Sequence, residues 1–195
     1  MLEDGYHAVP AGHTASVVTY LEMRARPALR PAPETGLVLE RVTSPDLARY
    51  RALFRAVGQD YLWFGRLTQS DAELGAILND ASVELYVAKA GGEDAGLLEL
   101  DFRTEGECEL AYFGLTEAHV GGGAGRWLMN EAIRRAWDAP IKRFFVHTCT
   151  LDHPKALAFY IRSGFTPYKR AIEIAPDPRQ TGLLPQTAAP QTPSV

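Results

Sequence analysis

The sequence predicts one α/β domain (mixed α+β) whose sheet is antiparallel in its first half and partly parallel in its second. Two features of the chain order support this fold class. Three strand-like runs in the middle of the chain follow one another without a helix, which is typical of antiparallel pairing, whereas helices separate the last strands, as crossover connections require. A length of 195 residues suffices for one substantial core but not for two.

The two ends of the chain are expected to lie outside the main domain. Residues 1–36 form an N-terminal extension, in which the β-branched and aromatic run at 14–23 predicts a strand. The segment 24–36 contains three prolines, whose fixed φ favours an extended, proline-rich arm over the surface. From residue 177 to 195 the chain has little to bury, which predicts a disordered tail.

The main domain is expected to span residues 37–176. Its first helix should begin at Ser44, whose side chain caps it, and should stop near Gly58. Ser70 and Glu73 have the spacing of a capping box, which predicts the start of a second helix. The remaining elements are strands at 37–42, 83–89, 95–102, 107–115, 144–149 and 165–174, and helices from the glycine cluster to about 137 and at 154–163.

Composition argues against several classes of protein. The net charge is −4 and no run of Lys or Arg exceeds two, so the chain lacks the basic surface that nucleic acid binding requires. No stretch approaches the roughly 20 apolar residues of a membrane span, and the acidic N-terminus is not typical of a signal peptide. Cys108 and Cys149 are too far apart for a zinc or redox motif, and we expect both to be buried in a reducing compartment. These features predict a cytoplasmic protein that binds neither nucleic acid nor membranes.

A glycine cluster at 121–125 follows a strand and precedes an amphipathic helix. Glycines let successive amides turn toward one point, and the first amides of a helix have no internal partners, so the segment predicts an anion site suited to a pyrophosphate. Arg126 and Trp127 stand where a Walker loop needs Lys and Ser or Thr, and Arg126 also replaces the third glycine of a dinucleotide fingerprint. The alternative is a flexible turn that binds nothing.

Two motifs resemble those of the GNAT acetyltransferase superfamily. The segment Val120–Gly125 is similar to the family's acetyl-CoA-binding loop, Gln/Arg-x-x-Gly-x-Gly/Ala, and residues 152–165, DHPKALAFYIRSGF, resemble its Asn-x-x-Ala-x-x-x-Tyr-x-x-x-Gly-Phe helix. The run HTCTLDHP is also similar to poorly characterised bacterial members. The resemblance covers roughly residues 37–174. It implies a GNAT-like mixed sheet with helices on both faces, a parallel strand pair that splays at the cofactor site, acetyl-CoA as cosubstrate and no metal.

The resemblance also implies cofactor contacts. The loop residues expected to hold the pyrophosphate are Val120, Gly121, Gly122, Gly123, Ala124 and Gly125. Val120 replaces the family's Gln or Arg, so its side chain cannot donate to phosphate, and His153 replaces the usual Asn but can still form one hydrogen bond. Leu115 is expected to pair with the pantetheine chain through its main chain, with Gly114 as a bulge. Arg126 either reaches a phosphate or is solvated.

The family transfers an acetyl group directly to an amine, and two residues match roles in that reaction. Tyr160 corresponds to the helix tyrosine that acts as general acid toward the coenzyme sulfur; its alternative is aromatic packing. Glu109 stands where several members place a catalytic glutamate, and burial that raised its pKa would suit it as the base. Glu107 shares its strand face and is the other candidate. The alternative is a solvated glutamate at a strand edge.

The acceptor site is expected beside an aromatic run, Tyr61, Trp63 and Phe64, between the first two helices. Aromatic rings can frame an amine by cation–π contact, although core packing explains them equally well. Glu99 and Asp101 on a neighbouring strand would attract a cationic acceptor. The N-terminal strand at 14–23 either completes the sheet or covers this pocket.

Nucleophilic and metal chemistry are less consistent with the sequence. His147 and Cys149 share a strand face near His153, but the cysteine lacks the helix N-terminus that would lower its pKa. No carboxylate or further cysteine completes a metal site with these residues.

The sequence therefore predicts an N-acetyltransferase that moves an acetyl group from acetyl-CoA to a primary amine of a small molecule or peptide through a ternary complex, as a monomer or a homodimer. The main alternative is a CoA-binding regulatory or structural protein without transfer activity, which Val120 favours and which Tyr160 and Glu109 disfavour. A third interpretation is a nucleotide-binding protein, which ATP or NAD would stabilise.

Overall fold

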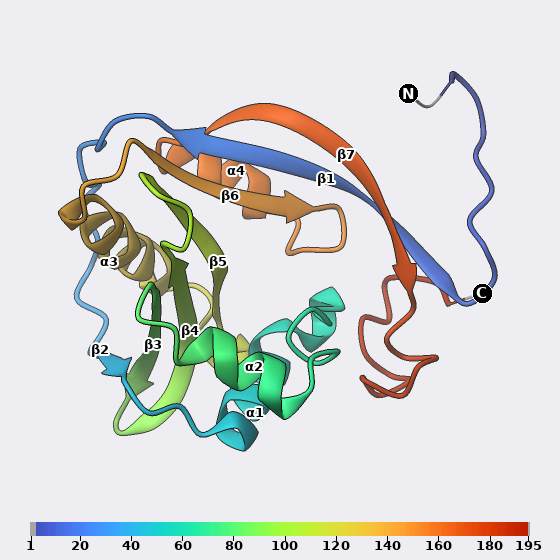
Figure 1. Cartoon of the computed structure of the whole chain (residues 1–195), viewed down its shortest axis with the longest axis horizontal. Helices are drawn as coiled ribbons and strands as arrows, with labels where there is room; N and C mark the ends of the chain where they lie inside the picture. Colours follow the sequence, from blue (N-terminus) through green and yellow to red (C-terminus); the bar gives the residue numbers. More distant parts are fainter. Residues whose placement is uncertain (1–2, 195) are drawn as a thin grey trace.

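The computed structural model describes residues 3–194, which form a seven-stranded mixed sheet with helices on both faces (Figure 1). The strands are β1 His13–Met23, β2 Leu37–Val42, β3 Val83–Ala90, β4 Glu93–Asp101, β5 Glu107–Leu115, β6 Arg143–Cys149 and β7 Thr166–Pro176. The helices are α1 Leu47–Gly58, α2 Asp71–Leu78, α3 Ala124–Asp138 and α4 Ala156–Arg162, with 3₁₀ turns η1 Gln59–Tyr61 and η2 Glu117–His119. Residues 1, 2 and 195, which belong to the predicted extension and tail, lie outside the described residues.

The strand order in the sheet is β2-β3-β4-β5-β6-β1-β7. Neighbouring strands within residues 3–194 run antiparallel, except that β5 and β6 are parallel. The parallel pairing extends only from Glu107 opposite Arg143 to Glu109 opposite Phe145. Beyond these residues the two strands separate. The predicted mixed sheet, with a parallel pair that splays, is confirmed.

The sheet separates two hydrophobic cores, and the alternation of side chains along β4 shows how. Leu98 and Leu100 are buried in the core on the α3 and α4 face, whereas Leu97 is buried with α1 and α2 on the other face. Successive strand residues point to opposite faces, so both faces of β4 can be apolar only if helices cover both. The predicted placement of helices on both faces is confirmed.

The N-terminal strand is part of the sheet. β1 lies between β6 and β7 and pairs antiparallel with both, and its Leu21 and Met23 are buried against Phe144 in the core (Figure 1). Of the two alternatives for this strand, the structure shows that it completes the sheet. Without β1, both β6 and β7 would expose an unpaired main-chain edge.

The prediction that residues 177–195 are disordered is wrong for residues 177–194. Arg179 is buried and donates to the Asp177 carboxylate at 2.7 Å and to the Thr192 carbonyl at 2.8 Å. Leu184 is buried in the core that contains α1 and α2. The segment has too few apolar residues to form a core of its own, but it adds them to a core that other elements have already built.

The predicted start of the first helix is shifted, whereas the capping box is confirmed. Asp46, and not Ser44, caps α1, because its carboxylate accepts a hydrogen bond from the Arg49 amide at 3.0 Å. At α2 the Ser70 hydroxyl accepts from the Glu73 amide at 3.3 Å, and the Glu73 carboxylate accepts from the Ser70 amide at 2.9 Å. Both arrangements satisfy amides that the first helical turn leaves unpaired.

Candidate cofactor and active site

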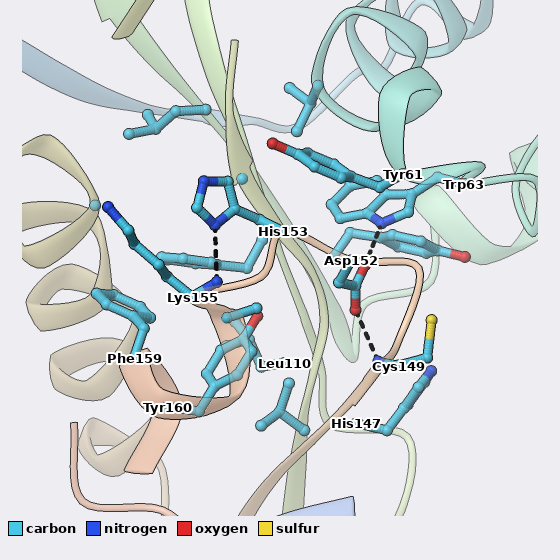
Figure 2. A pocket seen from close by; sticks show the side chains of 18 of the residues that line it. Tyr61, Trp63, Leu110, His147, Cys149, Asp152, His153, Lys155, Phe159 and Tyr160 are labelled. Carbon is cyan, nitrogen blue, oxygen red and sulfur yellow. Dashed lines mark hydrogen bonds between the residues drawn. The ribbon is translucent and has the colours of Figure 1, made fainter. Parts of the chain in front are cut away.

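The separation of β5 from β6 opens a cavity of about 560 Å³. Its walls come from the end of β5, the glycine loop at 120–126, the segment that follows α1, and the connection from β6 into α4 (Figure 2). The predicted cofactor residues that line this cavity are Leu115, Val120, Gly121, Gly123, Gly125, Arg126 and His153. Gly122 and Ala124 belong to the same loop but do not line the cavity. One continuous space therefore reaches both the predicted anion site and the aromatic run.

The glycine loop presents several free main-chain amides. Gly123 caps α3 with a φ of 86°, a left-handed conformation that glycine adopts without strain. The Trp127 amide donates to the Gly123 carbonyl, and the Ala124 amide donates to the Gly121 carbonyl. Within this loop, the main-chain amides of five residues have no acceptor among residues 3–194. These residues are Gly121, Gly122, Gly123, Gly125 and Arg126. Adjacent free amides at the positive end of a helix dipole suit a pyrophosphate.

The end of β5 offers main-chain groups to the cavity. The Thr116 amide donates to the Ala95 carbonyl of β4 at 2.9 Å. Because amides and carbonyls alternate in direction along a strand, the Leu115 carbonyl faces the opposite edge, where β6 has separated from β5. This edge suits an extended chain that carries amide groups, such as pantetheine.

The predicted bulge lies at Ala111 and not at Gly114. On β4, Glu99 pairs with Tyr112 and the next residue pairs with Leu110, so Ala111 is the extra residue. The bulge lets Leu110 face the α3 core while Tyr112 faces the α1 core. Gly114 has a different role, because a Cβ atom there would lie 2.4 Å from Cγ1 of Val57.

Arg126 and Val120 line the cavity beside the glycine loop. The Arg126 guanidinium donates to the Ser163 hydroxyl at 3.1 Å and lies 5.2 Å from the centre of the Phe159 ring. Arg126 is therefore held against α4 rather than freely solvated. Val120 is half exposed and has only an apolar side chain to offer.

Tyr160 lies in α4 at the wall of the cavity (Figure 2). Its ring is buried and packs edge-to-face on Phe165, while its hydroxyl has no hydrogen-bond partner among residues 3–194. Burial and, to a smaller extent, the nearby Asp152 carboxylate raise the pKa of Tyr160. The hydroxyl therefore stays protonated at neutral pH, which is the state in which it can donate a proton.

Glu109 and His147 form a contact that the sequence analysis did not identify. The Glu109 side chain does not line the main cavity; its Oε1 atom lies 3.5 Å from Nδ1 of His147, which does. A hydrogen bond to Glu109 raises the pKa of His147, while burial lowers it and the Asp152 and Glu173 carboxylates raise it further. Glu107 instead forms an ion pair with Arg143. The strand register could not be read from the sequence, so this pairing had no local signal.

Asp152 organises the connection between β6 and α4. Its carboxylate accepts hydrogen bonds from Trp63 Nε1 at 2.9 Å and from the Cys149 amide at 2.9 Å (Figure 2). It also accepts one from the Thr148 hydroxyl at 2.7 Å. In the sequence, Asp152 is simply the first residue of the segment that resembles the family's helix motif, and nothing there indicates these contacts. Its role here is to fix Trp63, which belongs to another part of the chain, against the cavity wall.

The aromatic run lies where the acceptor was expected. Tyr61, Trp63 and Phe64 all line the cavity. Trp63 also packs against the α1 core, with its ring centre 5.5 Å from that of Phe54. The run is therefore partly core and also part of the cavity wall.

The other two predicted acceptor residues do not line the cavity. Glu99 is fully buried, forms an ion pair with Arg66 and accepts a hydrogen bond from the Tyr50 hydroxyl at 2.8 Å. Asp101 forms an ion pair with Arg103 in a separate surface hollow. Alternation along β4 points Glu99 into the core beneath α1, so neither carboxylate faces an acceptor in the cavity.

The two remaining candidates have local roles. Nδ1 of His153 accepts a hydrogen bond from the Lys155 amide at 3.0 Å, and its ring contacts Tyr61 (Figure 2). Burial, followed by the Asp152 carboxylate, raises the pKa of Cys149, which disfavours a thiolate nucleophile. Residues 3–194 contain no group of three or more His, Cys, Asp or Glu side chains placed to hold a metal ion.

Comparison with known proteins identifies the family. The model of the acetyltransferase (GNAT) family matches residues 50–165, more than half of the chain. This chain belongs to the GNAT acetyltransferase family. GNAT enzymes use acetyl-CoA, and the matched region contains both the glycine loop and Tyr160. No curated protein matches the chain, and no helix formed by residues 3–194 is long and apolar enough to cross a membrane.

Solved structures, among them GNAT acetyltransferases, share the fold. A GCN5-related N-acetyltransferase from Sphaerobacter thermophilus is 16% identical with a TM-score of 0.61, over 88% of this chain and 53% of that protein. A functionally unknown conserved protein from Staphylococcus epidermidis is 15% identical with a TM-score of 0.60, over 85% of this chain and 63% of that protein. A GNAT acetyltransferase from Elizabethkingia anophelis, solved with acetyl-CoA bound, is 20% identical with a TM-score of 0.54. The match covers 70% of this chain and 80% of that protein. This GNAT chain thus spans less than two thirds of the first two proteins.

Proposed function

We propose that this GNAT protein transfers an acetyl group from acetyl-CoA to a primary amine by direct reaction in a ternary complex. The observation that carries the proposal is a single cavity that joins the free amides of the glycine loop, the unpaired Tyr160 hydroxyl and His147. An anion site alone would support binding only. A proton donor and a proton acceptor on the walls of the same cavity support transfer.

The residues present fit the coenzyme. The free amides at Gly121–Gly123 and at the start of α3 bind its pyrophosphate. The Leu115 main chain pairs with the pantetheine chain along the unpaired edge of β5. This path leads from the glycine loop toward Tyr160, because both line the same cavity. The main-chain amides of the loop supply the hydrogen bonds to phosphate that the Val120 side chain cannot donate.

His147 and Tyr160 carry the proton transfers of the reaction. His147 accepts one proton from the ammonium group, with Glu109 holding its ring through Nδ1. The amine nitrogen then bonds to the thioester carbonyl carbon, the carbon–sulfur bond breaks, and Tyr160 donates its proton to the leaving sulfur. The second proton of the nitrogen returns to the Tyr160 oxygen and His147 releases its proton to solvent, so ammonium and thioester give amide, free thiol and one proton.

The acceptor end of the cavity favours a cationic amine. Asp152 and Glu173 line it together with Tyr61, Trp63 and Phe64. Aromatic faces and carboxylates both attract an ammonium group before it loses its proton. The acceptor class is therefore a primary amine on a small molecule or on a peptide.

The test has two stages. Calorimetry with acetyl-CoA measures binding, and thiol release is then followed across diamines, amino sugars and peptide amines, with the acetylated product checked by mass spectrometry. We expect binding together with amine-dependent thiol release. Binding without release on any amine would favour the alternative, a CoA-binding protein without transfer activity. Stabilisation by ATP or NAD, but not by CoA, would contradict both.

A further inference from the structure

Three arginines from separate parts of the chain meet beside the glycine loop. Arg126 lies in the first turn of α3, Arg162 ends α4, and Arg30 belongs to the proline-rich arm at 24–36. The Arg30 guanidinium donates to the Arg162 carbonyl at 3.2 Å, and the Arg126 guanidinium donates to the hydroxyl of the next residue, Ser163. Arg126 and Arg162 both line the cavity that contains the glycine loop.

None of these three arginines has a carboxylate partner among residues 3–194, although acidic residues outnumber basic ones in this chain. Burial and, to a smaller extent, the positive charges of Arg30 and Arg162 lower the pKa of Arg126. Like charges held together without a counter-charge repel one another, so the cluster is suited to an anion that comes from outside the protein.

The proline-rich arm is fixed at this position by contacts on both sides of Arg30. The Asn130 side chain of α3 donates to the Arg30 carbonyl at 2.8 Å, and Arg26 forms an ion pair with Asp138 at 3.1 Å. Pro33 packs directly against Gly123, because a Cβ atom on that glycine would lie 2.3 Å from the Pro33 ring. In Figure 1 the segment between β1 and β2 passes the α3 end of the molecule. Arg30 is therefore held beside the loop and not on a free segment.

We infer that Arg30, Arg126 and Arg162 form a second anion subsite that binds the 3′-phosphate of CoA, so that the proline-rich arm is part of the cofactor site. The inference rests on the proposed function, since it assigns a further contact to the same cofactor. The free amides of the loop already match the pyrophosphate. A terminal phosphate monoester carries more charge and offers three oxygens, which guanidinium groups bind through paired hydrogen bonds. Arg30 lies outside the region that the family model matches.

The test compares CoA with dephospho-CoA, which lacks only the 3′-phosphate, by calorimetry on the full chain. We expect the wild-type protein to bind CoA about 10- to 100-fold more tightly than dephospho-CoA. Arg30→Gln and Arg162→Gln should each remove most of this preference and leave the affinity for dephospho-CoA within about twofold. The preference of the wild-type protein should also shrink as salt is added.

Arg26→Gln is the matched control, because it removes a positive charge from the same arm at a residue that already has an acidic partner. It should keep the preference for CoA. Equal binding of CoA and dephospho-CoA by the wild-type protein would overturn this inference while leaving the proposed function standing. Failure of both to bind would overturn the two together. A thermal unfolding midpoint for Arg30→Gln equal to that of wild type shows that a lost preference is not a loss of fold.

Discussion

Nδ1 of His147 lies 3.5 Å from Oε1 of Glu109, which joins a side chain on the cavity wall to a carboxylate behind it. The contact follows from the parallel pairing of β5 and β6, which ends where Glu109 stands opposite Phe145. His147 is two residues farther along β6, on the same face, where the strands begin to separate. The splay that opens the cavity thus also exposes one edge of the histidine to it, while the other stays against Glu109.

Replacing Glu109 should change the pH dependence of catalysis. His147 accepts a proton only when neutral, so kcat/KM should rise as pH increases through its pKa. Glu109 raises that pKa, so Glu109→Gln should move the acidic limb of the kcat/KM profile to lower pH. The Asp152 and Glu173 carboxylates also raise the pKa of His147 and should keep part of the upward shift. The profile is measured with the best amine from the panel.

Glu107→Gln is the control, because Glu107 lies on the same strand face but pairs with Arg143. Its acidic limb should stay where it is in the wild type. His147→Gln should abolish the limb altogether. An unchanged profile in Glu109→Gln would remove Glu109 from the proton transfer, and an unchanged profile in His147→Gln would exclude His147 as the base.

Tyr160→Phe should slow turnover without weakening cofactor binding. The change removes only a hydroxyl that has no partner within residues 3–194, so the ring packing against Phe165 is kept. Loss of a general acid reduces kcat by about 10²- to 10⁴-fold. Affinity for CoA, measured by calorimetry, should stay within about twofold because the hydroxyl acts on the departing sulfur. Tyr168→Phe, the same change outside the cavity, should keep wild-type turnover. Wild-type kcat in Tyr160→Phe would rule out the acid role.

Gly123→Ala should weaken binding of CoA. The residue has a φ of 86°, and a new Cβ would lie 2.3 Å from the Pro33 ring, so the loop and the arm cannot both keep their positions. We expect a loss of affinity of at least about tenfold and a stability cost of about 1–3 kcal/mol. Gly92→Ala introduces the same strain at a φ of 95° in open space. Gly92→Ala should therefore lower the stability of the protein but leave its affinity for CoA unchanged. Equal affinity in both variants would show that the geometry at Gly123 does not govern binding.

Glu99→Gln should destabilise the fold. The Glu99 side chain has 0% exposure and pairs with Arg66, which is 9% exposed, so the change leaves a buried guanidinium without its counter-charge. Breaking such a pair costs about 3–5 kcal/mol. Asp138→Asn breaks the exposed pair with Arg26 and should cost less than about 1 kcal/mol. Urea unfolding measures both. Similar midpoints for the two variants would show that the buried pair contributes no more than a surface pair.

Much of the fold could be read from local patterns. Ser70 and Glu73 predict the start of α2, because a capping box involves residues only three apart, and this prediction was confirmed. The bulge in β5 had no such signal. It depends on how β4 and β5 align, and Ala111 became the extra residue because this alignment places Leu110 and Tyr112 on opposite faces.

The family, the succession of strands and helices along the chain, the glycine loop and the position of Tyr160 in a helix could be read from the amino-acid sequence, because each resides in a contiguous motif or a regular period of side chains. The folded chain was needed to show that His147 faces the cavity, that Glu99 does not, and that the proline-rich arm lies against Gly123. These outcomes depend on strand register and on contacts between residues far apart in the chain. A shift of one residue in register turns a strand side chain from one face to the other, and no local pattern records that choice.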